Sequence, residues 1–142
     1  PSTQETIASS ASFVNGKIYI IDGYTGGPTG NEVSSSEVHI YDAATGIYSL
    51  GSPLTDAIDD QIQCVYKDSL IYVISGWSNF SSINKVQIYA TYNDTWLVNN
   101  NMPTGNDYPI FGSNGIVSNK LLKLTWRKPT LPIVENIQLF IN

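Results

Sequence analysis

Few side chains in this sequence are of the types that usually carry out catalysis or bind metals. The chain has one histidine, His39, and one cysteine, Cys64. Sites that need two histidines, an internal disulfide or several zinc-binding thiolates are therefore excluded within this chain. Asp59 and Asp60 are adjacent acids, but neighbouring residues on a strand point to opposite faces, so they cannot act as an acid–base pair. The sequence predicts no catalytic set, no metal site and no cofactor.

Each of these residues also has an expected structural setting. His39 lies in an alternating run and is expected to be a half-exposed strand residue, and Cys64 is expected to be a small buried hydrophobic residue. Asp59 and Asp60 are expected in a solvated turn that leads into a strand. A cation held by these two acids is the alternative, although they lack the regular spacing of Asp-rich calcium loops.

The composition narrows the class of protein. The 142 residues carry a formal net charge of −5, and only 13% of them are charged, against about 25% in typical domains. Seven basic residues against twelve acidic ones disfavour nucleic-acid binding. No apolar run approaches the roughly 18 residues of a membrane span. With 42% hydrophobic residues, a packed core is expected.

The elements that would position these residues are strands. Residues 18–21 and 70–74 are apolar runs, closed by Asp22-Gly23 and Ser75-Gly76. Residues 38–41 and 86–89 alternate between apolar and polar side chains. Asn15-Gly16 between two such runs is typical of a two-residue hairpin turn. Apolar residues do not recur at helical spacing, so helix is expected to be negligible.

The strands belong to an internal repeat. Three kinds of residue recur at similar spacing: a glycine that ends a strand, a tyrosine, and an aromatic residue seven positions after that tyrosine. The pairs are Gly23 and Gly76 (53 residues apart), Tyr41 and Tyr89 (48 apart), and Tyr48 and Trp96 (48 apart). A third, weaker unit has Phe140 in place of the tyrosine.

The repeat divides the chain into units of about 1–52, 53–102 and 103–142. The first two units are predicted to hold four strands each, and the third to stop before its fourth strand. The predicted strands are 7–14, 18–22, 37–42 and 47–50; 61–66, 70–75, 85–91 and 95–98; and 110–117, 121–126 and 135–141.

This pattern resembles the kelch repeat, in which a strand ends in a glycine pair and a spaced tyrosine is followed by a tryptophan. The resemblance covers nearly the whole chain. Asp22 and Ser75 stand in place of the first glycine in the first and second units, Thr125-Trp126 replaces the pair in the third, and Tyr48 replaces the tryptophan in the first. A kelch unit of about 50 residues is one four-stranded blade of a β-propeller. The resemblance implies an all-β chain with two complete blades and an incomplete third.

The resemblance also implies positions for the repeated residues and for a binding face. The two glycines are expected where backbones approach closely or φ is positive, and the repeated aromatic residues, Phe140 included, are expected in the core. Binding in kelch-like proteins is usually on the face that bears the loops between the second and third strands and between blades. The candidates on these loops are Tyr24, Asp59, Asp60, Trp77, Asn79, Phe80, Asp107, Tyr108 and Arg127.

The sequence leaves three functions open. The first is a recognition or scaffold module that binds a protein or a glycan through these loops. The second is part of a kelch-type carbohydrate-active enzyme, such as a sugar mutarotase or epimerase, which would need charged groups converging on the channel. The third is a structural half-propeller that only self-associates. Because no catalytic set is visible, the sequence favours a non-enzymatic role.

Three units, one of them incomplete, would leave sheet faces uncovered, because closed propellers have about 4–8 blades. Two copies could close a six-bladed ring, so a homodimer is expected. Because the chain begins with Pro1 and its last unit lacks an outer strand, we also expect a fragment of a longer protein. The sequons that begin at Asn79 and Asn93 favour export slightly over a cytoplasmic location.

Overall fold

A computed structural model of the chain is all-β, with no helix in the part that it describes. It describes residues 7–21, 23–26, 33–79, 81–101, 114–118, 121–127 and 134–140; for residues 98–100, and from residue 114 onward, it describes the backbone alone. The strands form three larger antiparallel sheets and one small two-stranded sheet. The predicted all-β class is confirmed.

The first sheet contains four antiparallel strands in the order β1-β2-β5-β6. The strands are β1 (Ser10–Val14), β2 (Lys17–Ile21), β5 (Val38–Asp42) and β6 (Tyr48–Gly51). Asn15 and Gly16 both have positive φ, at 48° and 79°, which is the backbone that a type I′ hairpin turn requires. The Asn15-Gly16 turn predicted from the sequence is thus confirmed.

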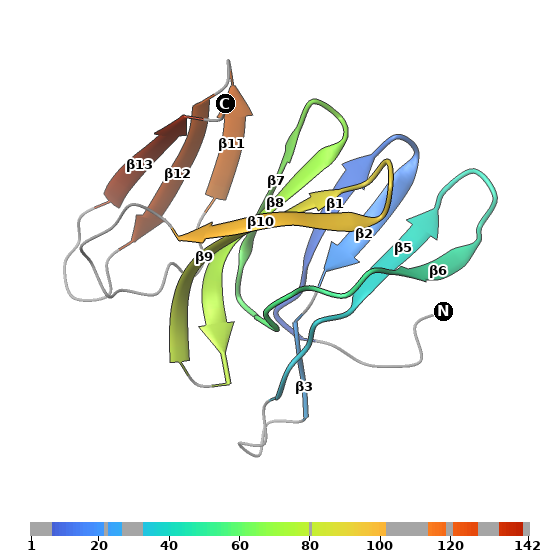
Figure 1. Cartoon of the computed structure of the whole chain (residues 1–142), viewed down its shortest axis with the longest axis horizontal. Helices are drawn as coiled ribbons and strands as arrows, with labels where there is room; N and C mark the ends of the chain where they lie inside the picture. The colour runs from blue at the N-terminus through green and yellow to red at the C-terminus, as the bar shows by residue number, and fades with distance from the viewer. Residues whose placement is uncertain are drawn as a thin grey trace.

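A short hairpin extends the loop between β2 and β5. It consists of β3 (Tyr24–Thr25) and β4 (Val33–Ser34), which pair antiparallel. These two strands were not predicted, because each has only two residues and carries no alternating pattern. They add a finger at the end of the first sheet, where the candidate loops lie (Figure 1).

The second sheet repeats the order of the first. Its strands are β7 (Ile62–Tyr66), β8 (Leu70–Ser78), β9 (Ser81–Ala90) and β10 (Thr95–Asn101), with β7 and β10 at the edges. β8 and β9 run past the predicted strand ends at residues 75 and 85, and a bulge between Ile74 and Gly76 interrupts their register. The hairpin beyond this bulge corresponds to the β3–β4 finger of the first repeat.

The third sheet has three strands in the order β11-β12-β13. They are β11 (Asn114–Ser118), β12 (Leu121–Arg127) and β13 (Val134–Phe140). β1 contacts β7, and β7 contacts β11, so equivalent first strands of the three units are neighbours. Figure 1 shows the second sheet between the first and the third.

The described core lies between the first and second sheets. The first sheet contributes Val14, Tyr19, Ile21 and Val38, and the second contributes Ile71, Val73 and Tyr89, with Leu54 and Ile58 from the segment that joins the sheets. The rings of Tyr19 and Tyr89 meet edge to face at 5.9 Å between centroids. Burial of this apolar area is the main force that holds the two sheets together.

The repeated aromatic residues differ in their exposure. Tyr89 is fully buried, and Trp96 is partly buried against the core with its ring centroid 5.0 Å from that of Tyr89. Tyr48 is half-buried. Tyr41 is 42% exposed, so the expectation that it lies in the core is wrong. The side chain of Phe140 lies outside the described residues.

The two repeated glycines have the role that the sequence predicts. Gly23 and Gly76 have φ of 114° and 120°, a region that L side chains rarely adopt. A Cβ atom on Gly76 would lie 2.3 Å from the carbonyl oxygen of Asp59, and one on Gly23 would lie 2.7 Å from that of Ile7. Both glycines are required by backbone conformation and by close backbone approach.

A group of hydrogen bonds ties β9, β10 and the turn between them to Ser52, which follows the last strand of the first sheet. The backbone amide of Ser52 donates to Asp94 Oδ1 at 2.7 Å, the Ser52 hydroxyl donates to the Asp94 carbonyl at 2.7 Å, and Trp96 Nε1 donates to the Ser52 carbonyl at 2.8 Å. The Tyr89 hydroxyl donates to the same carboxylate oxygen of Asp94. We call Ser52, Tyr89, Asp94 and Trp96 the inter-sheet clasp.

The clasp predicts an acid-dependent loss of stability. Partial burial raises the pKa of Asp94, but the hydrogen bonds from Tyr89 and Ser52 outweigh it and hold that pKa below its usual value. The unfolded chain therefore binds this proton at a higher pH than the folded chain, so the contribution of Asp94 is present above about pH 4 and is lost as the pH falls further.

We expect Asp94→Asn to unfold with a flatter dependence on pH between about pH 5 and pH 2 than the unmodified chain, because the titrating group is gone. The measurement is urea unfolding at a series of pH values, followed by circular dichroism. An unchanged slope below pH 5 would contradict the role of this carboxylate.

Candidate functional site

The candidate loop residues that the structure describes gather at one end of the first two sheets. Tyr24 lies in β3, and Asp59 and Asp60 lie in the segment that joins the sheets. Trp77 lies near the end of β8, and Asn79 follows that strand. We call this end, with Ser34 of β4, the loop platform. Phe80, Asp107 and Tyr108 lie outside the described residues, and Arg127 ends β12 with only its backbone described.

Two equivalent backbone bridges organise the platform. Ile7 and Tyr24 exchange two hydrogen bonds, at 3.1 and 2.8 Å, and Asp59 and Trp77 exchange two more, both at 2.9 Å. Each bridge begins just beyond one of the two repeated glycines, because only a residue without a Cβ allows the strands to approach there. The repeat therefore positions Tyr24 and Trp77 at equivalent places on neighbouring units.

Ser34 connects the two units across the platform. Its hydroxyl donates to Asp59 Oδ2 at 2.6 Å and accepts a hydrogen bond from the backbone amide of Asn79 at 2.9 Å. Its own backbone amide donates to Asn79 Oδ1 at 3.4 Å. Three segments distant in sequence are thus held together: the β3–β4 finger, the joining segment and the β8–β9 hairpin. Sequence analysis did not identify Ser34, since a lone serine carries no pattern.

The two adjacent acids have different environments. Asp59 is 8% exposed and bonded to Ser34, so the prediction of a solvated turn is wrong for it. Asp60 is exposed, as predicted, with a positive φ of 54°, and partial burial raises the pKa of its carboxyl. The Asp59 carboxylate is thus held by Ser34 inside the platform, whereas Asp60 lies at the surface.

The side chains that the platform offers are aromatic and polar. Tyr24 and Trp77 are half-buried, while Asp60 and Asn79 are exposed. In the described part of the chain, no group of three or more His, Cys, Asp or Glu residues is placed to hold a metal ion. Such a surface fits recognition by stacking and hydrogen bonding.

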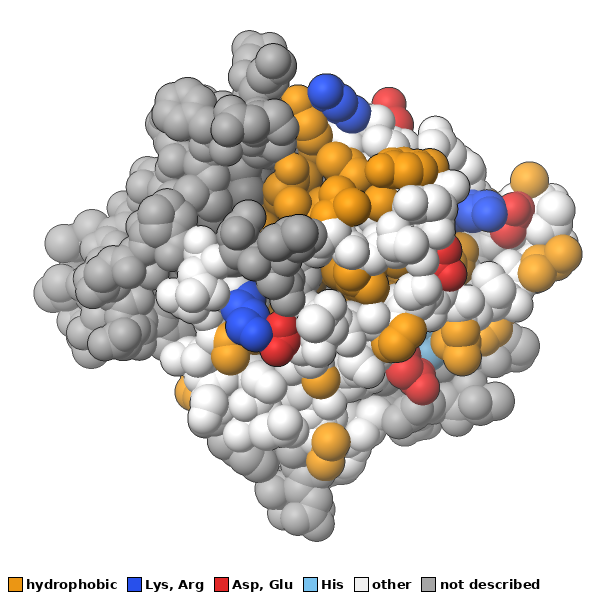
Figure 2. Space-filling model, viewed as in Figure 1, with side chains coloured by type: hydrophobic (Ala, Val, Ile, Leu, Met, Phe, Trp, Pro, Cys, Tyr) orange, Lys and Arg blue, Asp and Glu red, His pale blue; other side chains and the backbone are white. Residues whose placement is uncertain are grey.

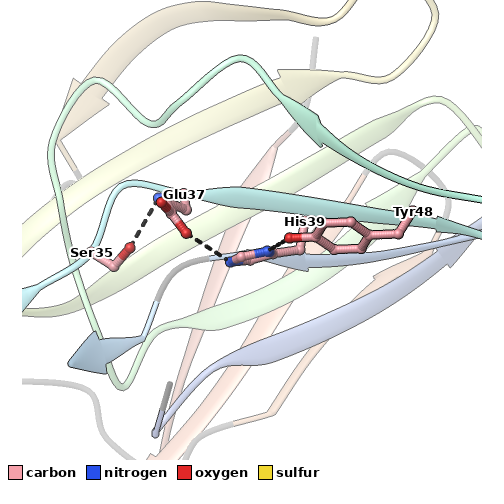
Figure 3. A network of polar contacts seen from close by, with 4 residues as sticks. All are labelled: Ser35, Glu37, His39 and Tyr48. Carbon is pink, nitrogen blue, oxygen red and sulfur yellow. Dashed lines mark hydrogen bonds and ion pairs between the residues drawn. The ribbon is translucent and has the colours of Figure 1, made fainter. Parts of the chain in front are cut away.

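A second polar cluster lies away from the platform, on the first sheet. His39 Nδ1 bonds the Tyr48 hydroxyl, and its Nε2 lies 3.2 Å from a carboxylate oxygen of Glu37 (Figure 3). The backbone amide of Glu37 is held in turn by the Ser35 hydroxyl at 3.1 Å. His39 is only 4% exposed, so the prediction of a half-exposed histidine is wrong.

The burial of His39 has a local cause. Ile20 and Leu50 are its direct partners on the two neighbouring strands, and the ring of Tyr48 stands 5.7 Å from its ring. These three residues are therefore the neighbours that flank the imidazole on the sheet. Figure 2 shows hydrophobic side chains on both sides of the single histidine.

Cys64 has no chemical role in the described site. It is buried on β7 and unpaired with any other cysteine, as predicted. Burial raises the pKa of its thiol to about 12. The reactive thiolate is therefore scarce near neutral pH.

No protein-family model matches this chain, and no curated protein matches it. Among the described residues no helix is long and apolar enough to cross a membrane.

Proposed function

We propose that this chain is a recognition module built from kelch-type propeller blades, which binds a protein or a glycan through its loop platform. The observation that carries the proposal is the Ser34–Asp59–Asn79 network, which joins three loops from two units into one surface. A surface that internal hydrogen bonds already hold in place loses little conformational entropy on binding. The free energy of binding is therefore not reduced by the ordering of loops.

The backbone supports the kelch-type part of the proposal. Ser75 has a positive φ of 55° immediately before Gly76, at the position where the kelch pattern has its first glycine. Its hydroxyl donates to the Ile83 carbonyl at 2.8 Å, which offsets part of the strain of that conformation. The neighbouring first strands β1, β7 and β11 are arranged as those of successive blades would be.

The binding proposal is tested on the purified chain with a glycan array and with pull-down from a cell lysate. We expect Trp77→Ala combined with Asn79→Ala to reduce the captured signal at least tenfold, because a recognition anchor and an exposed amide are both lost. The matched control is Tyr92→Ala, which removes an exposed aromatic ring in the turn between β9 and β10, at the opposite end of the second sheet.

The control should bind as the unmodified chain does. Equal binding by the platform variant and the control, with both folded by circular dichroism, would contradict the assignment of the platform. If the unmodified chain captures neither a glycan nor a specific protein, the recognition function itself is wrong.

A further inference from the structure

The first sheet has one face that nothing in the described part of the chain covers. Two rows of cross-strand partners lie on it, one with Phe13 at its end and one with Leu50 at its end. The rows are Phe13, Ile18, Tyr41 and Tyr48, and Ala11, Ile20, His39 and Leu50. We call these eight residues the outer face; the opposite side of the same sheet packs into the core.

The outer face is apolar and exposed. Phe13 is 65% exposed and Leu50 is 60% exposed, and the side chains of Ile20 and Tyr41 are each more than one third exposed. None of the eight residues is acidic, and none is a lysine or arginine. Exposed apolar residues that adjoin across four strands, in contrast to scattered ones, mark an interaction surface.

The repeat indicates what this surface is built to meet. In the second sheet the corresponding rows are Val65, Ile71, Tyr89 and Trp96, and Gln63, Val73 and Gln87. Ile71, Val73, Gln87 and Tyr89 are each fully buried. Ile71, Val73 and Tyr89 are buried because the inner side of the first sheet packs on them.

The second sheet is covered by the first sheet and by the segment that follows it. Ser12 and Gln63 join the two sheets by a hydrogen bond of 2.8 Å, and Gln87 holds the backbone of Asp56 in the joining segment at 2.9 and 3.0 Å. The clasp adds Ser52. On the outer face, Tyr41 and Tyr48 occupy the positions of Tyr89 and Trp96, and His39 occupies that of Gln87.

We propose that the outer face docks onto the third sheet of a second copy of this chain. The third sheet lies at the opposite end of the row of sheets (Figure 1). The third sheet of one copy can therefore pack on the outer face of another copy, as the first sheet packs on the second within one chain. Two copies related by a two-fold axis make this contact twice, which leaves no outer face uncovered and gives six sheets, within the range of closed propellers of about 4–8 blades.

The proposal is independent of the loop platform and is tested by the mass of the purified chain in solution. Multi-angle light scattering after gel filtration, at several micromolar concentrations, should give twice the mass of one chain. We expect the double variant Phe13→Glu/Leu50→Glu to give the mass of one chain, because each glutamate would have to be buried without a partner in the contact.

The matched control is Val33→Glu/Tyr92→Glu, which also replaces two exposed apolar residues, but on the β3–β4 finger and in the β9–β10 turn, away from the outer face. It should keep the doubled mass. Circular dichroism checks that both variants are folded.

Three results would each overturn the proposal. They are an unmodified chain with the mass of one copy, an outer-face variant that still dimerises, and open assemblies larger than two copies. The platform variant Trp77→Ala/Asn79→Ala should remain dimeric, so failure of recognition and failure of docking are distinguishable.

Discussion

Replacing Tyr89 with alanine is expected to lower the free energy of unfolding by about 3–5 kcal/mol, as the removal of a buried aromatic ring does. Tyr89 is fully buried and its ring contacts both Tyr19 and Trp96, so the surrounding side chains cannot fill the space it leaves. Its hydroxyl also donates to Asp94, and the loss of that bond weakens the inter-sheet clasp. Urea unfolding, followed by tryptophan fluorescence, measures the effect.

The matched control is Tyr41→Ala, which makes the same chemical change at the equivalent position of the first unit. Because Tyr41 is exposed, its removal should change the free energy of unfolding by less than about 1 kcal/mol, as most surface substitutions do. Both variants should be compared in the Phe13→Glu/Leu50→Glu background, in which association contributes nothing. Similar effects at the two positions would show that the first sheet does not bury Tyr89 as described.

The second large effect is expected for Gly76→Ala, which should destabilise the chain by about 3 kcal/mol or more. Two penalties add at this position. The φ of 120° is unfavourable for any residue with a Cβ, and the new methyl group would lie 2.3 Å from the Asp59 carbonyl oxygen. That carbonyl cannot move without breaking the Asp59–Trp77 bridge, so the platform would be distorted as well.

Gly16→Ala is the control for the backbone penalty alone. Gly16 also has a positive φ, of 79°, but a Cβ there meets no atom within 4 Å. We expect a loss of about 1–2 kcal/mol, the cost of left-handed backbone. If Gly76→Ala is no more destabilising than Gly16→Ala in thermal or urea unfolding, the close approach at Asp59 is not a constraint on the fold.

The sequence alone predicts most of the longer strands of this protein, but not β3, β4 or the extended ends of β8 and β9. Short apolar or alternating runs and the Asn15-Gly16 turn indicate where these strands lie, since these are properties of a few neighbouring residues. The spacing of Gly23 and Gly76 showed that the same unit occurs twice. The burial of Cys64 followed from its place on an apolar strand at the start of its unit.

Contacts between units were decided only by the tertiary structure. Ser34 and Asp59 are 25 residues apart, and their hydrogen bond buries an acid that the sequence placed in solvent. His39 lies between Ile20 and Leu50, which become its neighbours only through strand register. No local pattern encodes these pairings, because side chains from distant segments meet only when the sheets have formed.

Tyr41 and Tyr89 show most directly what the sequence predicts and what only the packing of the sheets decides. They are the same residue type at the same position of the repeat, on strands that the sequence places correctly, and yet one is 42% exposed and the other fully buried. The burial of a repeated residue depends on whether a neighbouring sheet packs against its face, not on the unit that contains it. The sequence determined which residues each unit directs to that face, and only the stacking of the sheets decided which of those residues are covered.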